Sequence, residues 1–283
     1  AEAIIDIIEA KTEDSLSLAV SQLDGTVSSF VKDVREQLIA MIAHLEVTID
    51  YPEEDIEDVT SQEVREQLQP ILKAMDELLS TANTGRLIRD GITTVIVGRP
   101  NAGKSSLMNA LLRENRAIVT DIPGTTRDSI EEYMTVEGIS LRLIDTAGIR
   151  DTQDTVEALG VQRARDYINK ADIVLCVIDG STLLTPEEIE ILTSVSGLNT
   201  IVLLNKSDVA QVVTDEHIKE HGTFTAIERI SAKEGEGSAV LSKWVQELVY
   251  GGRVKQDNSA MISNVRHISL MEQAKAQVEQ ALS

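Results

Sequence analysis

The loop from Gly98 to Ser105, Gly-Arg-Pro-Asn-Ala-Gly-Lys-Ser, constrains the fold more than any other stretch of the chain. An apolar run at 93–97 precedes it, and the helix-like segment 106–112 follows it. Glycines let the backbone curl, so that successive N–H groups and the positive end of the helix face one anion. A strand, this loop and a helix in that order are typical of a phosphate-binding P-loop. The stretch therefore predicts nucleotide binding.

The side chains of this loop have separate expected tasks. Lys104 would reach the β- and γ-phosphates of the nucleotide, and the Ser105 hydroxyl would ligate Mg²⁺. The predicted phosphate-binding residues of the loop are Asn101, Ala102, Gly103, Lys104, Ser105 and Ser106.

A second motif, Asp-Thr-Ala-Gly at 145–148, follows the apolar run 140–144. An aspartate at the end of that strand, Asp145, can hold Mg²⁺ through a water molecule. The backbone N–H of Gly148 can reach the γ-phosphate and respond to its loss on hydrolysis. The position after a strand, downstream of a P-loop, makes this short motif informative.

Two more motifs predict which base is bound. Asn205-Lys206-Ser207-Asp208 follows the apolar run 201–204, and Ser-Ala-Lys at 231–233 follows the last expected strand. The Asp208 carboxylate can accept hydrogen bonds from the ring N–H and the exocyclic amine of guanine, whereas adenine offers no such donor pair on that edge. The predicted base-binding residues are Asn205, Lys206, Asp208, Ser231, Ala232 and Lys233, and the predicted nucleotide is GTP or GDP.

Short apolar runs alternate with helix-like segments from 92 to 250, which predicts a mostly parallel sheet covered by helices on both faces. We expect strands near 92–97, 130–137, 139–144, 172–178, 200–204 and 225–230. We expect helices near 104–112, 158–169, 186–195, 214–221 and 238–249. Ligands of such sheets bind beyond the carboxyl ends of the strands, where all the motifs above fall.

The flanking segments are predicted to be helical. Apolar residues recur at helical spacing from Leu16 to Ile49, which predicts one long helix with a possible bend at Gly25. A second helix is expected from about 64 to 79, fraying at 83–85. The last helix carries Met271, Ala274, Val278 and Leu282 on one side and should pack on the helices of 1–90.

The predicted fold is therefore an α/β P-loop GTPase domain inserted into an all-α helical domain. We expect the N-terminal helical part at 1–91, the GTPase domain at 92–250, and a linker with the returning helix at 251–283. The 26 Lys and Arg against 47 Asp and Glu give a net charge of −21, which argues against a broad electrostatic surface for nucleic acid or anionic lipid. Cys176 lies in an apolar run and is expected to be a small buried hydrophobe. No leader or membrane-spanning run is expected, so a cytoplasmic location fits best.

These motifs resemble those of the translation-factor-related GTPases, and within that class the chain resembles the MnmE (TrmE) family of tRNA-modifying GTPases. The resemblance is carried by Asn101, by Gly-Thr-Thr-Arg-Asp at 124–128 and by Val-Glu-Ala-Leu-Gly at 156–160. The opening Ala-Glu-Ala-Ile at 1–4 and the turn at 50–54 also look like the start of that family's helical domain. The resemblance covers almost the whole chain.

The resemblance implies further site residues. Thr125 would contact the nucleotide, and Thr126 would close onto Mg²⁺ and the γ-phosphate. Asn101, with backbone carbonyls of the 118–124 loop that include Thr120 and Ile122, would hold K⁺ as a second cofactor beside Mg²⁺. Glu157 would orient the attacking water, although a carboxylate that merely favours a helix N-terminus is an alternative interpretation.

The resemblance also implies partners: GTP and GDP, a homodimer formed through the GTPase domains in K⁺, the protein MnmG (GidA), and tRNA as substrate of the complex, with no membrane. The implied reaction is GTP hydrolysis that drives modification of the wobble uridine of certain tRNAs. Family members also carry a folate-binding domain and a cysteine-containing tail, so the chain is expected to be a fragment.

Two other functions share the nucleotide motifs. A ribosome-assembly GTPase of the Era or Der type should bring a basic RNA-binding module, whereas the flanks here are helical and acidic. A GTP-dependent scaffold would use hydrolysis only as a timer, with sluggish turnover that does not respond to K⁺.

Overall fold

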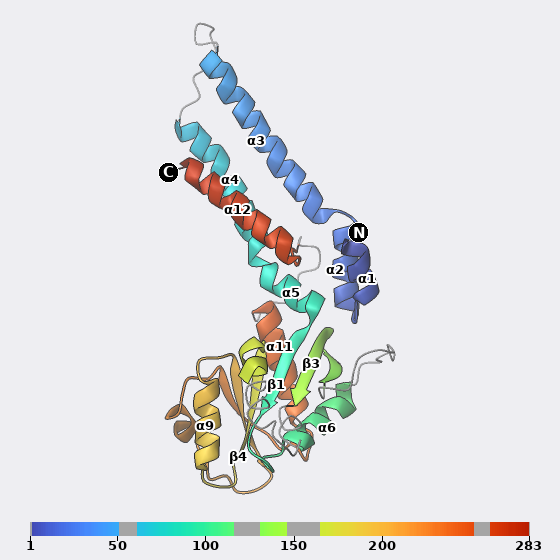
Figure 1. The fold of residues 1–283 in the computed structure, drawn as a ribbon, viewed down its shortest axis with the longest axis vertical. Coiled ribbons are helices and arrows are strands. Elements are labelled where there is room, and N and C mark those ends of the chain that lie inside the picture. The colour runs from blue at the N-terminus through green and yellow to red at the C-terminus, as the bar shows by residue number, and fades with distance from the viewer. Residues whose placement is uncertain (1, 51–60, 116–130, 146–164, 252–260, 283) are drawn as a thin grey trace, which may run out of the picture. The chain divides into compact units, whose positions relative to one another are not determined.

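The computed structural model describes residues 2–50, 61–115, 131–145, 165–251 and 261–282 (Figure 1). The chain forms two compact units. The helical unit comprises Ala1–Arg89 and Val254–Ser283, and the sheet unit comprises Asp90–Arg253. Within the described ranges, no helix has the length and apolar character required to cross a membrane.

The sheet unit is built on a six-stranded sheet in the order β2-β3-β1-β4-β5-β6. Its strands are β1 (Ile92–Val97), β2 (Glu131–Val136), β3 (Ile139–Asp145), β4 (Ile173–Asp179), β5 (Thr200–Asn205) and β6 (Ala226–Arg229). Among the described strands, β2 alone runs antiparallel to its neighbour, and the other pairs are parallel. The predicted mostly parallel sheet is confirmed.

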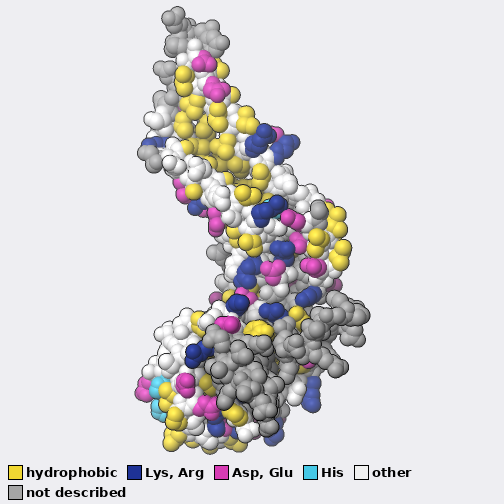
Figure 2. All heavy atoms as spheres, in the orientation of Figure 1, with side chains coloured by type: hydrophobic (Ala, Val, Ile, Leu, Met, Phe, Trp, Pro, Cys, Tyr) yellow, Lys and Arg dark blue, Asp and Glu magenta, His cyan; other side chains and the backbone are white. Residues whose placement is uncertain are grey.

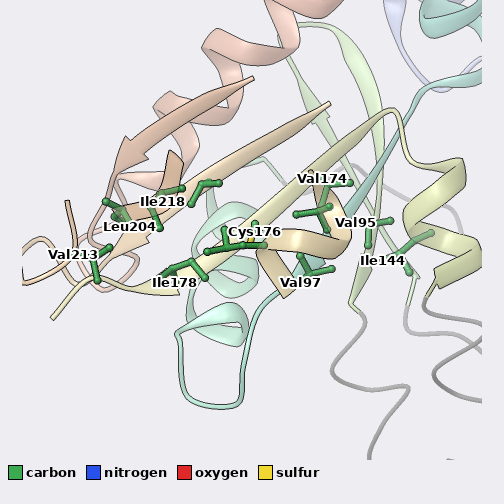
Figure 3. Packing of buried hydrophobic residues seen from close by; sticks show 12 residues of the cluster. Val95, Val97, Ile144, Val174, Cys176, Ile178, Leu204, Val213 and Ile218 are labelled. Atoms are coloured by element: carbon green, nitrogen blue, oxygen red, sulfur yellow. The ribbon is translucent and has the colours of Figure 1, made fainter. Parts of the chain in front are cut away.

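Apolar strands and amphipathic helices form the core of the sheet unit. The described helices are α6 (Lys104–Asn115), α9 (Pro186–Val195), α10 (Asp215–Lys219) and α11 (Gly237–Tyr250), with a helical segment at 165–170. Val95 of β1, Ile144 of β3 and Cys176 of β4 belong to one buried cluster (Figure 3). Burial, with a smaller contribution from the charge of Glu188, raises the pKa of the Cys176 thiol to about 12. Cys176 is thus the small buried hydrophobe that the sequence predicts.

The buried cluster of the helical unit is built on α4 (Ser61–Ser80). Its helices are α1 (Glu2–Glu9), α2 (Glu13–Leu23), α3 (Thr26–Asp50), α4 (Ser61–Ser80), α5 (Ala82–Asp90) and α12 (Val265–Leu282). Leu68, Ile71 and Met75 of α4 form a buried cluster with Ile262 and with Met271 of α12. The C-terminal helix therefore packs on α4 and completes a core that neither helix could bury alone.

Two details of the last helix differ from the predicted stripe. Val278 and Leu282 pack against the buried cluster, but Ala274 is exposed. Lys275 takes the neighbouring inward position, and its Nζ lies 2.6 Å from Oδ1 of Asp76 on α4. A long lysine side chain can cover apolar surface and still place its ammonium group beside a carboxylate, which alanine cannot do.

The predicted single long helix from Leu16 to Ile49 is wrong, because Gly25 adopts a left-handed φ of +82° and separates α2 from α3. Leu16 and Leu23 of α2 are 42% and 52% exposed. They therefore do not continue the apolar stripe of α3, which begins at Phe30 and packs against the buried cluster. Figure 2 shows hydrophobic side chains gathered on the surface of the helical unit.

The predicted fraying at 83–85 is also wrong, because these residues lie in α5. Gly85 is buried, and a Cβ there would lie 2.5 Å from the carbonyl oxygen of Ile262. The glycine therefore permits a close helix-to-backbone approach, and the burial of Leu87 and Ile88 outweighs the low helix propensity of the segment. Of the predicted turn at 50–54, residues 51–54 lie outside the described residues.

Candidate nucleotide-binding site

The P-loop connects β1 to the first turn of α6, as the sequence predicts. Asn101 and Gly103 have φ values of 62° and 105°, and Gly98 has a φ of 150°. A side chain at Gly98 would collide with the carbonyl oxygen of Val177 on β4, so the loop can pass close to the sheet only with glycine there. Since α6 begins at Lys104, the N–H groups of its first turn and its positive dipole end adjoin the curled loop.

Lys104 is only 7% exposed and folds back over the loop. Its Nζ donates hydrogen bonds to the carbonyl oxygens of Gly98 and Arg99, both at 2.7 Å. Ala102 is buried, whereas Ser105 and Ser106 lie exposed in the first turn of α6. The exposed hydroxyls are available to a ligand at the helix N-terminus.

Asn205 at the carboxyl end of β5 joins the predicted phosphate and base motifs. Its side-chain Nδ2 donates to the Ala102 carbonyl oxygen at 2.7 Å, and its Oδ1 accepts from the Ala232 N–H at 2.9 Å. Asn205 is 3% exposed, so both bonds are shielded from water. One side chain therefore sets the spacing between the P-loop, the Asn-Lys-Ser-Asp loop and the Ser-Ala-Lys loop.

Asp208 lies against the Ser-Ala-Lys loop. The Ser231 hydroxyl donates to Oδ1 of Asp208 at 3.0 Å, and Nζ of Lys233 lies 4.0 Å from Oδ2. Glu236 in turn accepts from the Ser231 N–H at 2.7 Å. The Asp208 side chain remains 29% exposed, so its carboxylate is oriented by neighbours yet accessible to a base.

Lys206 has a left-handed φ of 66°, which is costly for a residue with a side chain and must be held by its surroundings. Its Nζ donates to Oδ2 of Asp179 at 2.6 Å, and its carbonyl oxygen accepts from Nε2 of Gln211 at 2.7 Å. Burial opposes ionisation of Asp179, but hydrogen bonds from Lys206 and Ser181 and the Lys206 charge outweigh it and lower the pKa of that carboxyl.

The sequence interpretation missed Asp179. The signal that could have found it is an acidic residue directly after the apolar run 173–178, at the strand end where ligands of parallel sheets bind. The sequence interpretation also missed Arg99, which contacts both Asp179 and Glu188, and Glu188 itself.

Several predicted residues lie outside the described part of the chain: Thr120, Ile122, Thr125, Thr126, Gly148 and Glu157. The backbone of Asp145 ends β3 beside Ile96 of β1, but its side chain is not among the described groups. Of the predicted Mg²⁺ and K⁺ ligands, the structure therefore describes Ser105 and Asn101. Over the described ranges, no three His, Cys, Asp or Glu side chains are grouped to hold a metal. Hydroxyl and amide oxygens, as in Ser105 and Asn101, are the donor types that suit such hard cations.

A P-loop between β1 and α6, with two further loops tied to it at the same edge of a mostly parallel sheet, is the architecture of the P-loop GTPase class. The family model described as "MnmE helical domain" matches residues 1–283. The chain belongs to the MnmE family.

Two bacterial relatives agree with this assignment. The chain is 45% identical over 284 residues to a "tRNA modification GTPase MnmE" of Geobacillus thermodenitrificans, and the match covers 100% of this chain and 62% of the relative. It is also 45% identical over 282 residues to the protein of the same name from Clostridioides difficile, covering 100% of this chain and 61% of that relative. The chain thus spans about three fifths of the length of these relatives.

Among solved structures, the chain is similar to Era of Aquifex aeolicus bound to GDP.AlF4−, with 27% identity and a TM-score of 0.42 over 62% of each chain. That likeness is too loose to bear on the assignment. Because the chain belongs to the MnmE family, we set aside the alternative that it is a ribosome-assembly GTPase of the Era or Der type.

Proposed function

We propose that this chain binds GTP and GDP and hydrolyses GTP. The observation that supports this most directly is the Asn205 bridge, which ties buried Ala102 of the P-loop to the loop that orients Asp208. A phosphate-binding loop and a carboxylate suited to guanine are thereby held at a fixed separation. Preorganised groups of this kind favour binding because little ordering remains to be done when the ligand arrives.

Each described group has a proposed task in binding. Lys104 would turn its ammonium from the loop carbonyls to the phosphates, and the N–H groups of the loop would bind the phosphate oxygens. The Ser105 hydroxyl, with Thr126, would hold Mg²⁺, which when bound supplies positive charge beside the phosphates. Asn101, with Thr120 and Ile122, would hold K⁺, which adds charge near the bond to be broken. Glu157 would position the attacking water.

We propose a wider role from the family. The relatives carry the name tRNA modification GTPase MnmE, and this chain corresponds to about three fifths of them. We infer that GTP hydrolysis here drives modification of the wobble uridine of certain tRNAs, in the cytoplasm and together with MnmG. Homodimers would form through the GTPase units when GTP and K⁺ are present.

Glu157→Ala is expected to lower GTP turnover about 10²-fold and to leave GTP affinity nearly unchanged, because a water-positioning group acts on chemistry and not on binding. Single-turnover hydrolysis and nucleotide titration would measure the two effects separately. Glu190→Ala, an exposed substitution on α9, is the control and should change neither. Parallel loss of affinity and turnover would favour the helix-terminus interpretation of Glu157.

Dimerisation and fast turnover are expected to require K⁺. The described P-loop arginine, Arg99, is bonded to Glu188 and Asp179, so we assign the neutralisation of charge in the transition state to the proposed K⁺ site. Sedimentation of the GDP–aluminium fluoride complex should show dimers in K⁺ and monomers in Na⁺, and GTP turnover should rise with protein concentration only in K⁺. Asn101→Ala should weaken both effects, whereas Asn109→Ala, on the exposed side of α6, should not. Equal dimer content in the two salts, with sluggish turnover in each, would favour the scaffold alternative.

A further inference from the structure

Four charged side chains form a cluster beside the proposed nucleotide site: Arg99, Asp179, Glu188 and Lys206. Nε of Arg99 donates to Oε1 of Glu188 at 2.8 Å, and its Nη2 lies 3.4 Å from Oδ2 of Asp179. The same Asp179 oxygen accepts from Nζ of Lys206 at 2.6 Å. The side chain of Glu188 is 0% exposed, that of Asp179 is 5% exposed, and that of Arg99 is 23% exposed. We call this group the four-charge cluster.

Both oxygens of Glu188 are occupied by donors. Oε1 accepts from Arg99, and Oε2 accepts from the N–H and the hydroxyl of Thr185, each at 2.9 Å. A glutamine at this position would have to turn its NH₂ group towards one of these donors. The site therefore requires two acceptor oxygens at this position and not merely a side chain of that shape.

The cluster links parts of the sheet unit that are far apart in sequence. Arg99 belongs to the P-loop, Asp179 ends β4, Glu188 lies in the first turn of α9, and Lys206 precedes Asp208 by two residues. Lys206 holds its left-handed backbone conformation only while its neighbours keep it there. Displacement of Lys206 would therefore move the loop that carries Asp208.

We propose that Arg99 and Glu188 are positioning residues that set guanine selectivity, because they hold Asp179, and through it Lys206 and Asp208, at a fixed place relative to the P-loop. The inference rests on the proposed binding of guanine nucleotides. Neither residue recognises the base in this scheme. Their effect passes through Asp179, which forms ion pairs with both Arg99 and Lys206.

The test compares dissociation constants for GDP and IDP, measured by calorimetry on the full chain. IDP lacks the exocyclic amine, so the ratio of the two constants reports how well Asp208 is placed for that donor. Partial unfolding lowers the apparent affinity for both nucleotides equally and cancels in the ratio. The variants are Glu188→Gln and Arg99→Met, and the control is Glu190→Gln, which removes an exposed charge two residues along the same helix.

We expect each variant to reduce the preference for GDP over IDP about 10-fold, as the loss of a charge-assisted contact predicts. The control should keep the wild-type ratio. Arg99→Met leaves the bonds between Glu188 and Thr185 intact, so it reports on the cluster even if Glu188→Gln folds poorly. The double variant should lose no more selectivity than either single variant, because both act through one contact.

Two outcomes are distinguishable as failures. A wild-type chain that binds no GDP, or that binds GDP and IDP equally, would overturn the proposed binding of guanine nucleotides, and this inference with it. A selective wild type whose two variants keep the same ratio, even with weaker binding of both nucleotides, would overturn the inference alone and reduce the cluster to a contribution to stability. Fully additive losses in the double variant would also contradict the single shared contact.

Discussion

Asp208→Asn is expected to remove the preference of the chain for guanine and to transfer it to xanthine. The carboxylate accepts two hydrogen bonds from guanine, whereas an asparagine places a donor where one acceptor stood. A site built to hydrogen-bond a group discriminates against a ligand lacking it by about 10⁴-fold, so the ratio of GDP to XDP affinity should change on that order. Calorimetric titration with both nucleotides would measure it.

The same substitution should leave the fold intact. The Ser231 hydroxyl, 3.0 Å from Oδ1 of Asp208, can still donate to the amide oxygen of an asparagine. Asp215→Asn is a matched control, because it removes the charge of an α10 carboxylate that pairs with Arg229 of β6 and lies outside the Asn-Lys-Ser-Asp motif. A variant Asp208→Asn with an unchanged preference for GDP over XDP would show that another group reads the base.

Asn205→Ala is expected to have the largest effect on the stability of the sheet unit. It strips partners from the Ala102 carbonyl and the Ala232 N–H, and each unsatisfied buried group costs about 1–3 kcal/mol. We therefore expect a loss of roughly 2–6 kcal/mol in the free energy of unfolding. Affinity for GDP should fall by about 100-fold or more beyond the effect of unfolding, because the phosphate and base loops lose their common tie.

Urea unfolding and nucleotide titration would separate these two losses. Asn199→Ala is the matched control, since Nδ2 of Asn199 donates to the Asp172 carbonyl at 2.7 Å, just before the first residues of β4 and β5. This control should lower stability without a specific loss of GDP affinity. If Asn205→Ala lost stability but kept wild-type affinity once the folded fraction was accounted for, the bridge would serve the fold and not the site.

The strands and the P-loop are predictable because their signals are local. Each apolar run of the sheet is short and bounded, and each strand of the structure lies within about two residues of its expected place. The helical unit is less predictable, because a helical stripe does not say which neighbour will cover it. The predicted continuous stripe through Gly25 is divided between two helices. Gly85 lies in a helix because the backbone of Ile262, far along the chain, packs so closely against it that a side chain would not fit.

By itself the sequence determined the P-loop, the mostly parallel sheet and the family, because short motifs and apolar periodicity can be recognised without knowledge of distant contacts. The role of Asp208 in guanine binding stays a prediction from the sequence. Only the tertiary structure decided that Asn205 bridges Ala102 and Ala232 and that Arg99 meets Asp179 and Glu188. Arg99 and Asp179 are 80 residues apart, and they meet because the parallel pairing of β1 with β4 brings their carboxyl ends to one edge of the sheet. Such meetings depend on strand order and register, which no local pattern encodes.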